Sequence, residues 1–466
     1  MRGEGWGGEV FGGDAGNPPG LPHGWGGANI DLAPAKDTTV NHHVIIGNGP
    51  AGVVAAETLR KNAPQADTIT LIGDEDAPPY SRMAIPYLLH GDITERGTWL
   101  RKDTHHWKTL RIELRCDRVK TVDTRAKTLA LEAGGQLGFD TLLIATGSKP
   151  ALPPIPGIHA QRVHTCWTLE DARAIAQFAV PGARVIQLGA GFIGCIIMES
   201  LVRRRVQLTV VEMGDRMVPR MMGEVAGGMI RDWVQAKGVR VHTGARIESI
   251  ESNPADMAAP LAVRLSTGER LPADLVISAA GVKPKIDFLE NSGVQCLQGV
   301  LTDARMQTNV PGIYAAGDCA EAFDMVYGKP IVSAIQPNAV DQAYVAAMNM
   351  AGKQAQLRGV TQSNVLDTLG LVSSSFGQWQ GVPGGQGVER TDRAGFRHLG
   401  LQFQGDVMVG SNSIGITEHI GVLRGLVEGR VRLGAWKDKL LADPTRLMEA
   451  YLASAQGQSR RGLLAA

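Results

Sequence analysis

The chain has 466 residues, which is enough for roughly two to four domains of ordinary size and excludes a single small binding module. Its 47 Lys and Arg residues against 46 Asp and Glu residues give a net charge of +1. This balance gives no electrostatic reason to expect nucleic acid or an anionic membrane as a partner. Hydrophobic residues make up 44% and charged residues 20%, as in a globular rather than a disordered chain.

The N-terminal residues 1–40 are rich in Gly and Pro and show no helical or strand periodicity. We expect a disordered extension there. A stacking tail for nucleic acid built on Trp6 and Trp25 is the alternative, which the few basic residues of this segment disfavour. The chain has no secretory h-region and no apolar run of about 18 residues, so we expect a soluble, cytoplasmic protein without a membrane partner.

A glycine-rich turn follows the first apolar strand. Gly47-Asn48-Gly49-Pro50-Ala51-Gly52 lies between the strand HHVII and a helix. In this pattern the first glycine permits a tight turn, the second lets the backbone reach a pyrophosphate, and the third lets helix and strand pack closely. The next strand, DTITLI, ends in Gly73-Asp74-Glu75, where an acceptor for ribose hydroxyls belongs. We choose Glu75 over Asp74 for that role, and the choice is close.

A second turn of the same kind, Gly189-Ala190-Gly191-Phe192-Ile193-Gly194, follows the strand VIQL, and its partner strand ends at Glu212. A carboxylate there accepts hydrogen bonds from the adenosine 2'- and 3'-hydroxyls and repels a 2'-phosphate, which favours NAD over NADP. Arg216, four residues further, is the alternative, because it could receive a 2'-phosphate.

The two turns belong to a weak internal repeat. One half runs from 44–59 to 142–147 and the other from 185–201 to 275–281, and each closes on an apolar strand with a small-small-Gly turn. Two copies of one nucleotide-binding unit explain this pattern. We therefore predict an α/β fold with two Rossmann-like, three-layer nucleotide-binding domains and a C-terminal α+β domain.

A third motif lies downstream, in VPGIYAAGDCAEA, where Asp318 follows a strand and a turn at Gly317. With its two fingerprints, ATG strand and terminal GD motif, the region 42–352 resembles the FAD-dependent pyridine nucleotide-disulfide oxidoreductase superfamily. The resemblance implies that Asp318 bonds the ribityl chain of FAD. The alternative is a plain turn, because Gly-Asp is a common turn dipeptide.

The resemblance implies roles for other residues as well. The first fingerprint would hold the FAD pyrophosphate above Ala145-Thr146-Gly147, and the second would hold NAD(H) with Gly281 near the nicotinamide. Arg82 matches an arginine that contacts the FAD phosphates in the ferredoxin-reductase-like branch, although a solvated arginine is the alternative. Val119 is carried over as a further FAD contact. The helix beginning near Gln336 would aim N–H groups at the C2 oxygen of the flavin.

The chain departs from the disulfide-reducing members. The helix after the first fingerprint has no CxxxxC pair, which excludes glutathione- or lipoamide-type chemistry. Met83 stands where other members carry a single redox cysteine, and a thioether forms neither thiolate nor sulfenate. The five cysteines are scattered and show no disulfide, zinc or iron-sulfur spacing. Electron transfer by flavin alone is the chemistry that is left, and no metal site is expected.

A charged pair of the family is also missing. The Lys near the flavin N5 corresponds to Tyr87, and the Glu after the NAD fingerprint corresponds to Ile196. Losing both avoids an unpaired buried charge, so we expect an unusually apolar N5 pocket with no assigned catalytic residue. The alternative is that the Tyr87 alignment is displaced by one residue and only the Glu is missing.

The remaining cysteines and histidines that we considered are expected to have no catalytic role. Cys166, Cys195 and Cys319 are expected to be small buried hydrophobes, and His105 and His106 to be solvated.

The C-terminal region is predicted to contain strands within 366–380 and 397–415 and a helical stretch over 419–452 that breaks near Pro444. Trp379 lies either near the flavin or, as we favour, in the core. The basic side chains of this region either dock an acidic redox partner or form a solvated helix face; they are Arg424, Arg430, Arg432, Lys437 and Lys439.

The predicted domains are an extension (1–40), an FAD-binding domain (41–160 and 282–355), an NAD-binding domain (161–281) and an interface domain (356–466). The resemblance implies hydride transfer from NADH to FAD and release of electrons to a separate acceptor. We expect a small iron-sulfur protein as acceptor, as for ferredoxin and rubredoxin reductases and the flavin part of NADH-dependent nitrite reductases. The alternatives are an NADH oxidase, a reductase of quinones or other small molecules, or a non-enzymatic switch like apoptosis-inducing factor. The chain could form a homodimer.

Overall fold

The computed structural model describes residues 40–252 and 260–454. The extension predicted over 1–40 lies outside the described residues except for Val40.

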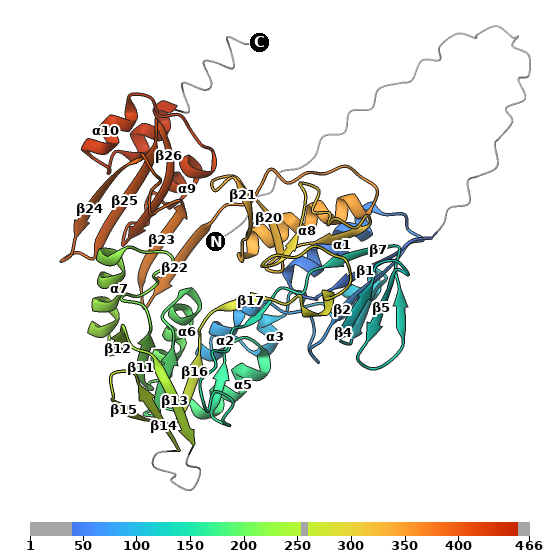
Figure 1. Cartoon of the computed structure of the whole chain (residues 1–466), viewed down its shortest axis with the longest axis horizontal. Helices are drawn as coiled ribbons and strands as arrows, with labels where there is room; N and C mark the ends of the chain where they lie inside the picture. Colours follow the sequence, from blue (N-terminus) through green and yellow to red (C-terminus); the bar gives the residue numbers. More distant parts are fainter. Residues whose placement is uncertain (1–39, 253–259, 455–466) are drawn as a thin grey trace, which may run out of the picture. The chain divides into compact units, whose positions relative to one another are not determined.

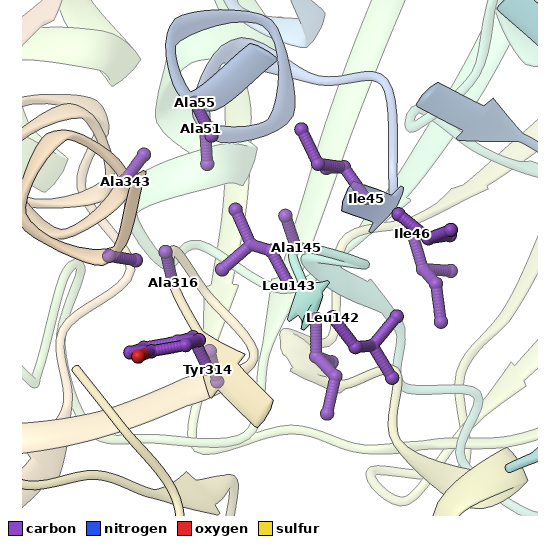
Figure 2. Close-up of a cluster of buried hydrophobic side chains, with 14 of the residues drawn as sticks. Ile45, Ile46, Ala51, Ala55, Leu142, Leu143, Ala145, Tyr314, Ala316 and Ala343 are labelled. Atoms are coloured by element: carbon purple, nitrogen blue, oxygen red, sulfur yellow. The ribbon is translucent and has the colours of Figure 1, made fainter. Parts of the chain in front are cut away.

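The first parallel sheet has the strand order β19-β7-β1-β2-β3. The strands β19, β7, β1 and β2 are largely buried because both faces of the sheet are covered there, whereas the edge strand β3 is mostly exposed. Helices α1 and α8 pack against each other and against this sheet (Figure 1). Figure 2 shows Ala51, Ala55 and Ala343, whose small side chains let the helices lie close to Leu143 and its neighbours. The elements are β1 (His42–Ile46), α1 (Pro50–Asn62), β2 (Thr68–Gly73), β3 (Ile112–Cys116), β7 (Thr141–Ile144), β19 (Ile313–Ala315) and α8 (Gln336–Met350).

Smaller elements complete this part of the chain. An antiparallel sheet, β4-β5-β6, shares the hydrophobic core of the first sheet, and β18-β20-β21 leads into α8. The strands are β4 (Val119–Asp123), β5 (Thr128–Leu131), β6 (Gln136–Gly138), β18 (Val300–Leu301), β20 (Ala320–Asp324) and β21 (Lys329–Val332). The short helices are the 3-10 turns Arg82–Ala84 and Asp287–Leu289, α2 (Ile85–His90), α3 (Glu95–Thr98) and α4 (His106–Thr109).

A second parallel sheet, in the order β12-β11-β10-β16-β9, repeats the design. An antiparallel sheet, β13-β14-β15, packs against it, and β8 and β17 form a two-stranded ribbon. The elements are β8 (Ser148–Pro150), β9 (Val163–Thr165), α5 (Leu169–Phe178), β10 (Arg184–Leu188), α6 (Phe192–Arg203), β11 (Gln207–Glu212), α7 (Glu224–Ala236), β12 (Arg240–Thr243), β13 (Ile247–Ser252), β14 (Leu261–Leu265), β15 (Arg270–Ala273), β16 (Leu275–Ser278) and β17 (Val282–Pro284). The two parallel sheets confirm the predicted pair of Rossmann-like units.

The C-terminal region is an antiparallel sheet, β22-β23-β26-β25-β24, with helices packed on it, which confirms the predicted α+β class (Figure 1). The helical stretch predicted over 419–452 breaks after Glu428 as well as near Pro444, and residues 447–454 form a further helical segment. The elements are β22 (Ser363–Thr368), β23 (Leu371–Gly377), β24 (Gln386–Asp392), β25 (Arg397–Gln404), β26 (Val407–Ile414), α9 (Ile420–Glu428) and α10 (Trp436–Ala442).

Candidate functional site

The first glycine-rich turn joins β1 to α1, and its three glycines meet different surroundings. A Cβ on Gly47, which has φ +110°, would lie 2.1 Å from the carbonyl oxygen of Ala145, and a Cβ on Gly52 would lie 1.8 Å from that of Gly47. A Cβ on Gly49 would meet nothing within 4 Å. The first and third glycines therefore permit packing, whereas the second leaves space in which a phosphate can approach the backbone.

This turn forms one wall of a large cleft, with about 1730 Å³ of empty volume, part of it open to solvent. Helix α1 begins at the cleft without a side-chain cap or an acidic residue in its first turn, so its first N–H groups are free to bind an anion. The residues predicted to contact FAD that line the cleft are Gly47, Gly49, Pro50, Ala51, Glu75, Arg82, Val119, Ala145, Gly147 and Asp318. Gly52 does not line the cleft; it packs behind the turn.

Glu75 and Arg82 lie together in the cleft, an arrangement that the sequence did not suggest. Arg82 Nη2 is 2.5 Å from Glu75 Oε1, and the Tyr80 hydroxyl donates to Glu75 Oε2 at 2.6 Å. Arg82 Nη1 donates to the Tyr80 hydroxyl at 2.9 Å and to the carbonyl of Trp167 at 2.6 Å. These contacts hold the guanidinium in place, although 36% of the Arg82 side chain is exposed. The neighbouring candidate Asp74 also lines the cleft, paired with Lys285 and Arg118.

Asp318 also lines the cleft, in the turn after β19, where a Cβ on the preceding Gly317 would lie 3.4 Å from the Cβ of Ala51 at the start of α1. Burial raises the pKa of this carboxyl, and the hydrogen bond that Ser148 Oγ donates to Oδ2 at 2.9 Å opposes the shift. The turn is fixed by buried Gln342 of α8, whose Oε1 accepts from the Gly317 N–H at 2.7 Å. A buried carboxylate with one protein donor is suited to accept hydroxyl groups from a ligand. Gly317-Asp318 does form a turn, as the alternative interpretation has it. That interpretation does not explain why the Asp318 carboxylate lines the cleft.

The predicted N5 pocket is only partly assembled. Ile196 lies on α6 and lines the cleft, together with Ile193 and Phe192. Tyr87 does not line the cleft, because it lies on the outer face of α2 and is 54% exposed. The cleft wall next to it is formed by Met83 and Pro86 instead. The wall is apolar, as expected, but Tyr87 is not a part of it.

The second glycine-rich turn joins β10 to α6 and repeats the geometry of the first. A Cβ on Gly189 would lie 2.5 Å from the carbonyl oxygen of Ala279, and one on Gly194 would lie 2.5 Å from that of Gly189, whereas Gly191 faces open space. Helix α6 also begins without a side-chain cap or an acidic residue in its first turn. Gly281, after β16, has φ +103° and open space at its Cβ position.

Glu212 lies at the end of β11, over this second turn. Its Oε2 accepts from the Ala190 N–H at 2.6 Å and its Oε1 from the Gly214 N–H at 2.7 Å. The carboxylate is thereby fixed beside the turn, where ribose hydroxyls of a bound dinucleotide would donate to its remaining lone pairs. Arg216 donates to the Met222 carbonyl and pairs with Asp215 at 2.7 Å, so it is already engaged.

The buried cysteines Cys166, Cys195 and Cys319 do not carry activated thiols. All five cysteines are unpaired, and Cys166 is the one that lines the cleft. Burial raises the pKa of Cys166 and of Cys195 to about 12 and also raises that of Cys319, which keeps all three protonated at neutral pH. They are the small buried side chains that the sequence predicted.

The two histidines differ from each other. His105 is exposed, whereas His106 Nε2 is 2.8 Å from Glu57 Oε1 and its ring packs edge-on against Trp107. The prediction that His106 is solvated is therefore wrong, because α1 and α4 bring a carboxylate to it. Among the described residues, no cluster of His, Cys, Asp and Glu could hold a metal ion, and no helix has the length and apolar character to cross a membrane.

Comparisons with known proteins decide the family. The model of the pyridine nucleotide-disulphide oxidoreductase family matches residues 41–349. The chain belongs to this family. The epsilon subunit of the NADH-dependent phenylglyoxylate dehydrogenase of Aromatoleum evansii is 30% identical over 414 residues, which are 88% of this chain and 97% of that protein.

Other relatives are electron-transfer reductases. The ferredoxin–NAD(+) reductase component of the biphenyl dioxygenase system of Paraburkholderia xenovorans is 32% identical over 59% of this chain and 66% of its own length. The solved ferredoxin reductase for the CYP199A2 system of Rhodopseudomonas palustris matches with a TM-score of 0.73 and 26% identity, over 80% of this chain and 91% of that one. The chain is thus an NADH-dependent oxidoreductase that uses FAD and NAD(H). The open side of Gly49, the uncapped start of α1 and the buried Asp318 fit FAD in the first cleft.

Proposed function

We propose that this chain oxidises NADH at the second glycine-rich turn and delivers the electrons, through FAD in the cleft, to a separate iron-sulfur protein. The observation that carries this proposal is the cleft wall beside α6, where Cys166 is protonated and the other lining side chains carry no thiol. FAD, when bound, accepts a hydride and can release its electrons singly. Turnover requires that these electrons pass to another molecule, and the cleft offers no thiolate to relay them, because Cys166 is protonated.

Different residues of the chain would bind NADH and FAD. Glu212 and the start of α6 would orient the adenosine and pyrophosphate of NADH, and the apolar wall of Ile193 and Ile196 would exclude water from the transfer path. Arg82 and the start of α1 would hold the FAD pyrophosphate, and Asp318 would accept hydrogen bonds from its ribityl chain.

The proposal includes the predicted domain boundaries. We assign residues 41–160 and 282–355 to the FAD-binding domain, 161–281 to the NAD-binding domain and 356–466 to the interface domain. The five unpaired cysteines support a reducing, cytoplasmic compartment. Relatives that are named as ferredoxin or rubredoxin reductases support an acceptor protein of the iron-sulfur type.

The test compares acceptors. The protein is reduced with NADH in the absence of air and mixed in turn with rubredoxin, 1,4-benzoquinone and air-saturated buffer. We expect rubredoxin to reoxidise the flavin faster than oxygen does. Reoxidation that is fastest with oxygen or with benzoquinone would contradict the proposed function and indicate an oxidase or a quinone reductase. A flavin that stays reduced with every acceptor would indicate a nucleotide-dependent switch instead.

A further inference from the structure

A second cavity, with about 570 Å³ of empty volume, lies beside the C-terminal sheet, and we name it the basic pocket. Its walls come from the segment that follows β11, from the hairpin of β20 and β21, and from strands β22 and β23. The side chains that matter below are Arg220, Lys329, Gln362, Asn364, Ser375 and Trp379.

The basic pocket holds two cations that the protein does not neutralise. Arg220 and Lys329 are exposed, and neither forms an ion pair or a side-chain hydrogen bond within 40–252 and 260–454. No carboxylate lines the pocket. By contrast, Arg424 and Arg432, two of the basic residues of the C-terminal region, are paired with Glu428 and Asp406. Two adjacent positive charges with open space between them attract a negatively charged group.

Neutral donors in the same pocket also lack partners. The side-chain amides of Gln362 and Asn364, the hydroxyl of buried Ser375 and the indole N–H of Trp379 have no hydrogen-bond partner in the described part of the chain. A carboxylate is an acceptor only and would satisfy several of these donors at once. Trp, Tyr and Arg are also the residue types that dominate protein interfaces, and Tyr327 stands at the rim, 41% exposed.

The pocket lies next to the flavin cleft. Lys329 and Ile331 of β21 line the pocket, and Ala334, shortly after the same strand, lines the cleft. Three residues of extended chain span at most about 10 Å. A second link runs through the start of α8, where Asn338 donates to the carbonyl of Thr361 at 3.1 Å, next to Gln362.

We propose that the basic pocket receives an acidic side chain of the iron-sulfur acceptor and so docks that protein beside the flavin cleft. This inference rests on the proposed function, because it names where the acceptor binds. The exposure of both cations favours a protein partner over a small anion, since a small anion is held tightly by donors that enclose it. The position also gives Trp379 a surface role, instead of the core or flavin role considered from the sequence.

The test uses the full-length holoprotein with the double substitution Arg220→Glu and Lys329→Glu. With an acidic rubredoxin as acceptor, we expect the KM for rubredoxin to be about tenfold or more higher in the variant, with kcat nearly unchanged. Added salt should slow the variant less than it slows the wild type. The rate of flavin reduction by NADH and the turnover with 1,4-benzoquinone, which is uncharged, are expected to match those of the wild type.

The control is Arg393→Glu, a reversal at an exposed cation outside the pocket, which is expected to leave the rubredoxin KM unchanged. If the charge-reversed double variant does not fold, the milder double variant Arg220→Gln and Lys329→Gln is used in its place.

An unchanged rubredoxin KM and an unchanged salt dependence in the pocket variants would overturn the docking site while leaving the proposed function intact. If the wild-type protein does not reduce rubredoxin at all, the proposed function itself is contradicted. If millimolar inorganic phosphate binds the wild type but not the pocket variant, and rubredoxin kinetics are equal in both, the pocket is a small-anion site and the docking proposal fails.

Discussion

The carboxylate of Glu212 is fixed before any nucleotide binds. Two backbone N–H groups, from Ala190 and Gly214, hold its oxygens at 2.6 and 2.7 Å. A charged group that is already oriented needs little reorganisation to accept the ribose hydroxyls, and it repels a phosphate at the same place. We therefore propose that the preference for NADH over NADPH depends on this one side chain.

Replacing Glu212 with Ala should weaken that preference. We expect kcat/KM for NADH to fall about tenfold and that for NADPH to rise, because the bonds to the ribose and the repulsion of the 2'-phosphate are lost together. Steady-state kinetics with both nucleotides and a fixed concentration of benzoquinone measure the ratio. A ratio equal to that of the wild type would show that another residue sets the specificity.

Replacing Cys166 with Ala should leave turnover almost unchanged. Its thiol lines the flavin cleft, but burial raises its pKa to about 12, so the protonated form predominates at working pH. We expect kcat within about twofold of the wild type, since only a small buried side chain is lost. A loss of most activity, with FAD still bound, would mean that this thiol takes part in electron transfer.

At the residue scale, the sequence predicted which residues line the cleft better than it predicted their contacts. Glycine positions and Asp318 follow from motifs because backbone geometry fixes them. The pairing of Glu75 with Arg82 depends on how the segment before α2 folds back, and no local pattern encodes it. Tyr87 was misplaced for a helical reason: Ile85 and Leu89 of α2 are buried, and a residue midway between them points to the opposite face.

At the scale of the strand-turn-helix element, the three glycines of a turn should be separable by experiment. Gly189→Ala introduces a Cβ 2.5 Å from a carbonyl oxygen at φ +99°, so we expect destabilisation of about 1–3 kcal/mol or more. Gly191→Ala meets open space and should leave thermal unfolding unchanged while raising the KM for NADH. Thermal unfolding and NADH kinetics of both variants are the measurement, and equal effects from the two would argue against a cofactor facing Gly191.

An ion pair joins the start of β10 to the turn before β16. Arg184 bonds both oxygens of Asp274, at 3.0 and 2.7 Å, and these bonds hold the pKa of the carboxyl below its ordinary value. A lowered pKa in the folded protein means stabilisation that is present above about pH 4 and lost as the pH falls through the folded pKa.

Asp274→Asn should therefore cost about 1–3 kcal/mol of unfolding free energy at neutral pH. The difference from the wild type should shrink toward zero as the pH falls through the lowered pKa of the wild-type carboxyl, because that carboxyl then becomes protonated too. Urea unfolding of both proteins across this pH range gives the comparison. A difference that does not depend on pH would assign the effect to packing instead.

Element types were predictable where burial imposes a pattern. In each parallel sheet, the central strand that precedes the glycine turn, β1 or β10, is largely buried, and both of these strands were expected. Strand β24 was missed, because its sequence, QGVERTD, is exposed almost throughout and shows no apolar alternation. The helical stretch after 419 was predicted as too continuous, since α9 ends with its C-cap at Gly429 and the chain then forms a β-bridge from Arg432 to Val407, the first residue of β26.

At the scale of the whole molecule, the proposed path of the electrons involves the two glycine-rich turns and one apolar wall. The wall that carries Ile193 and Ile196 belongs to α6, whose N-terminus also forms the second turn. One helix thus contacts both cofactor regions. The family fingerprints predicted this pairing from the sequence, whereas the identity of the acceptor depends on surface charges such as Arg220 and Lys329, which no fingerprint contains.

The most direct test of electron transfer by flavin alone is an anaerobic titration of the purified protein with NADH, followed by the flavin absorbance. A protein whose one two-electron centre is FAD should be fully bleached by one NADH per FAD. A requirement for two NADH per FAD would reveal a second redox centre, such as a disulfide, and would contradict the account.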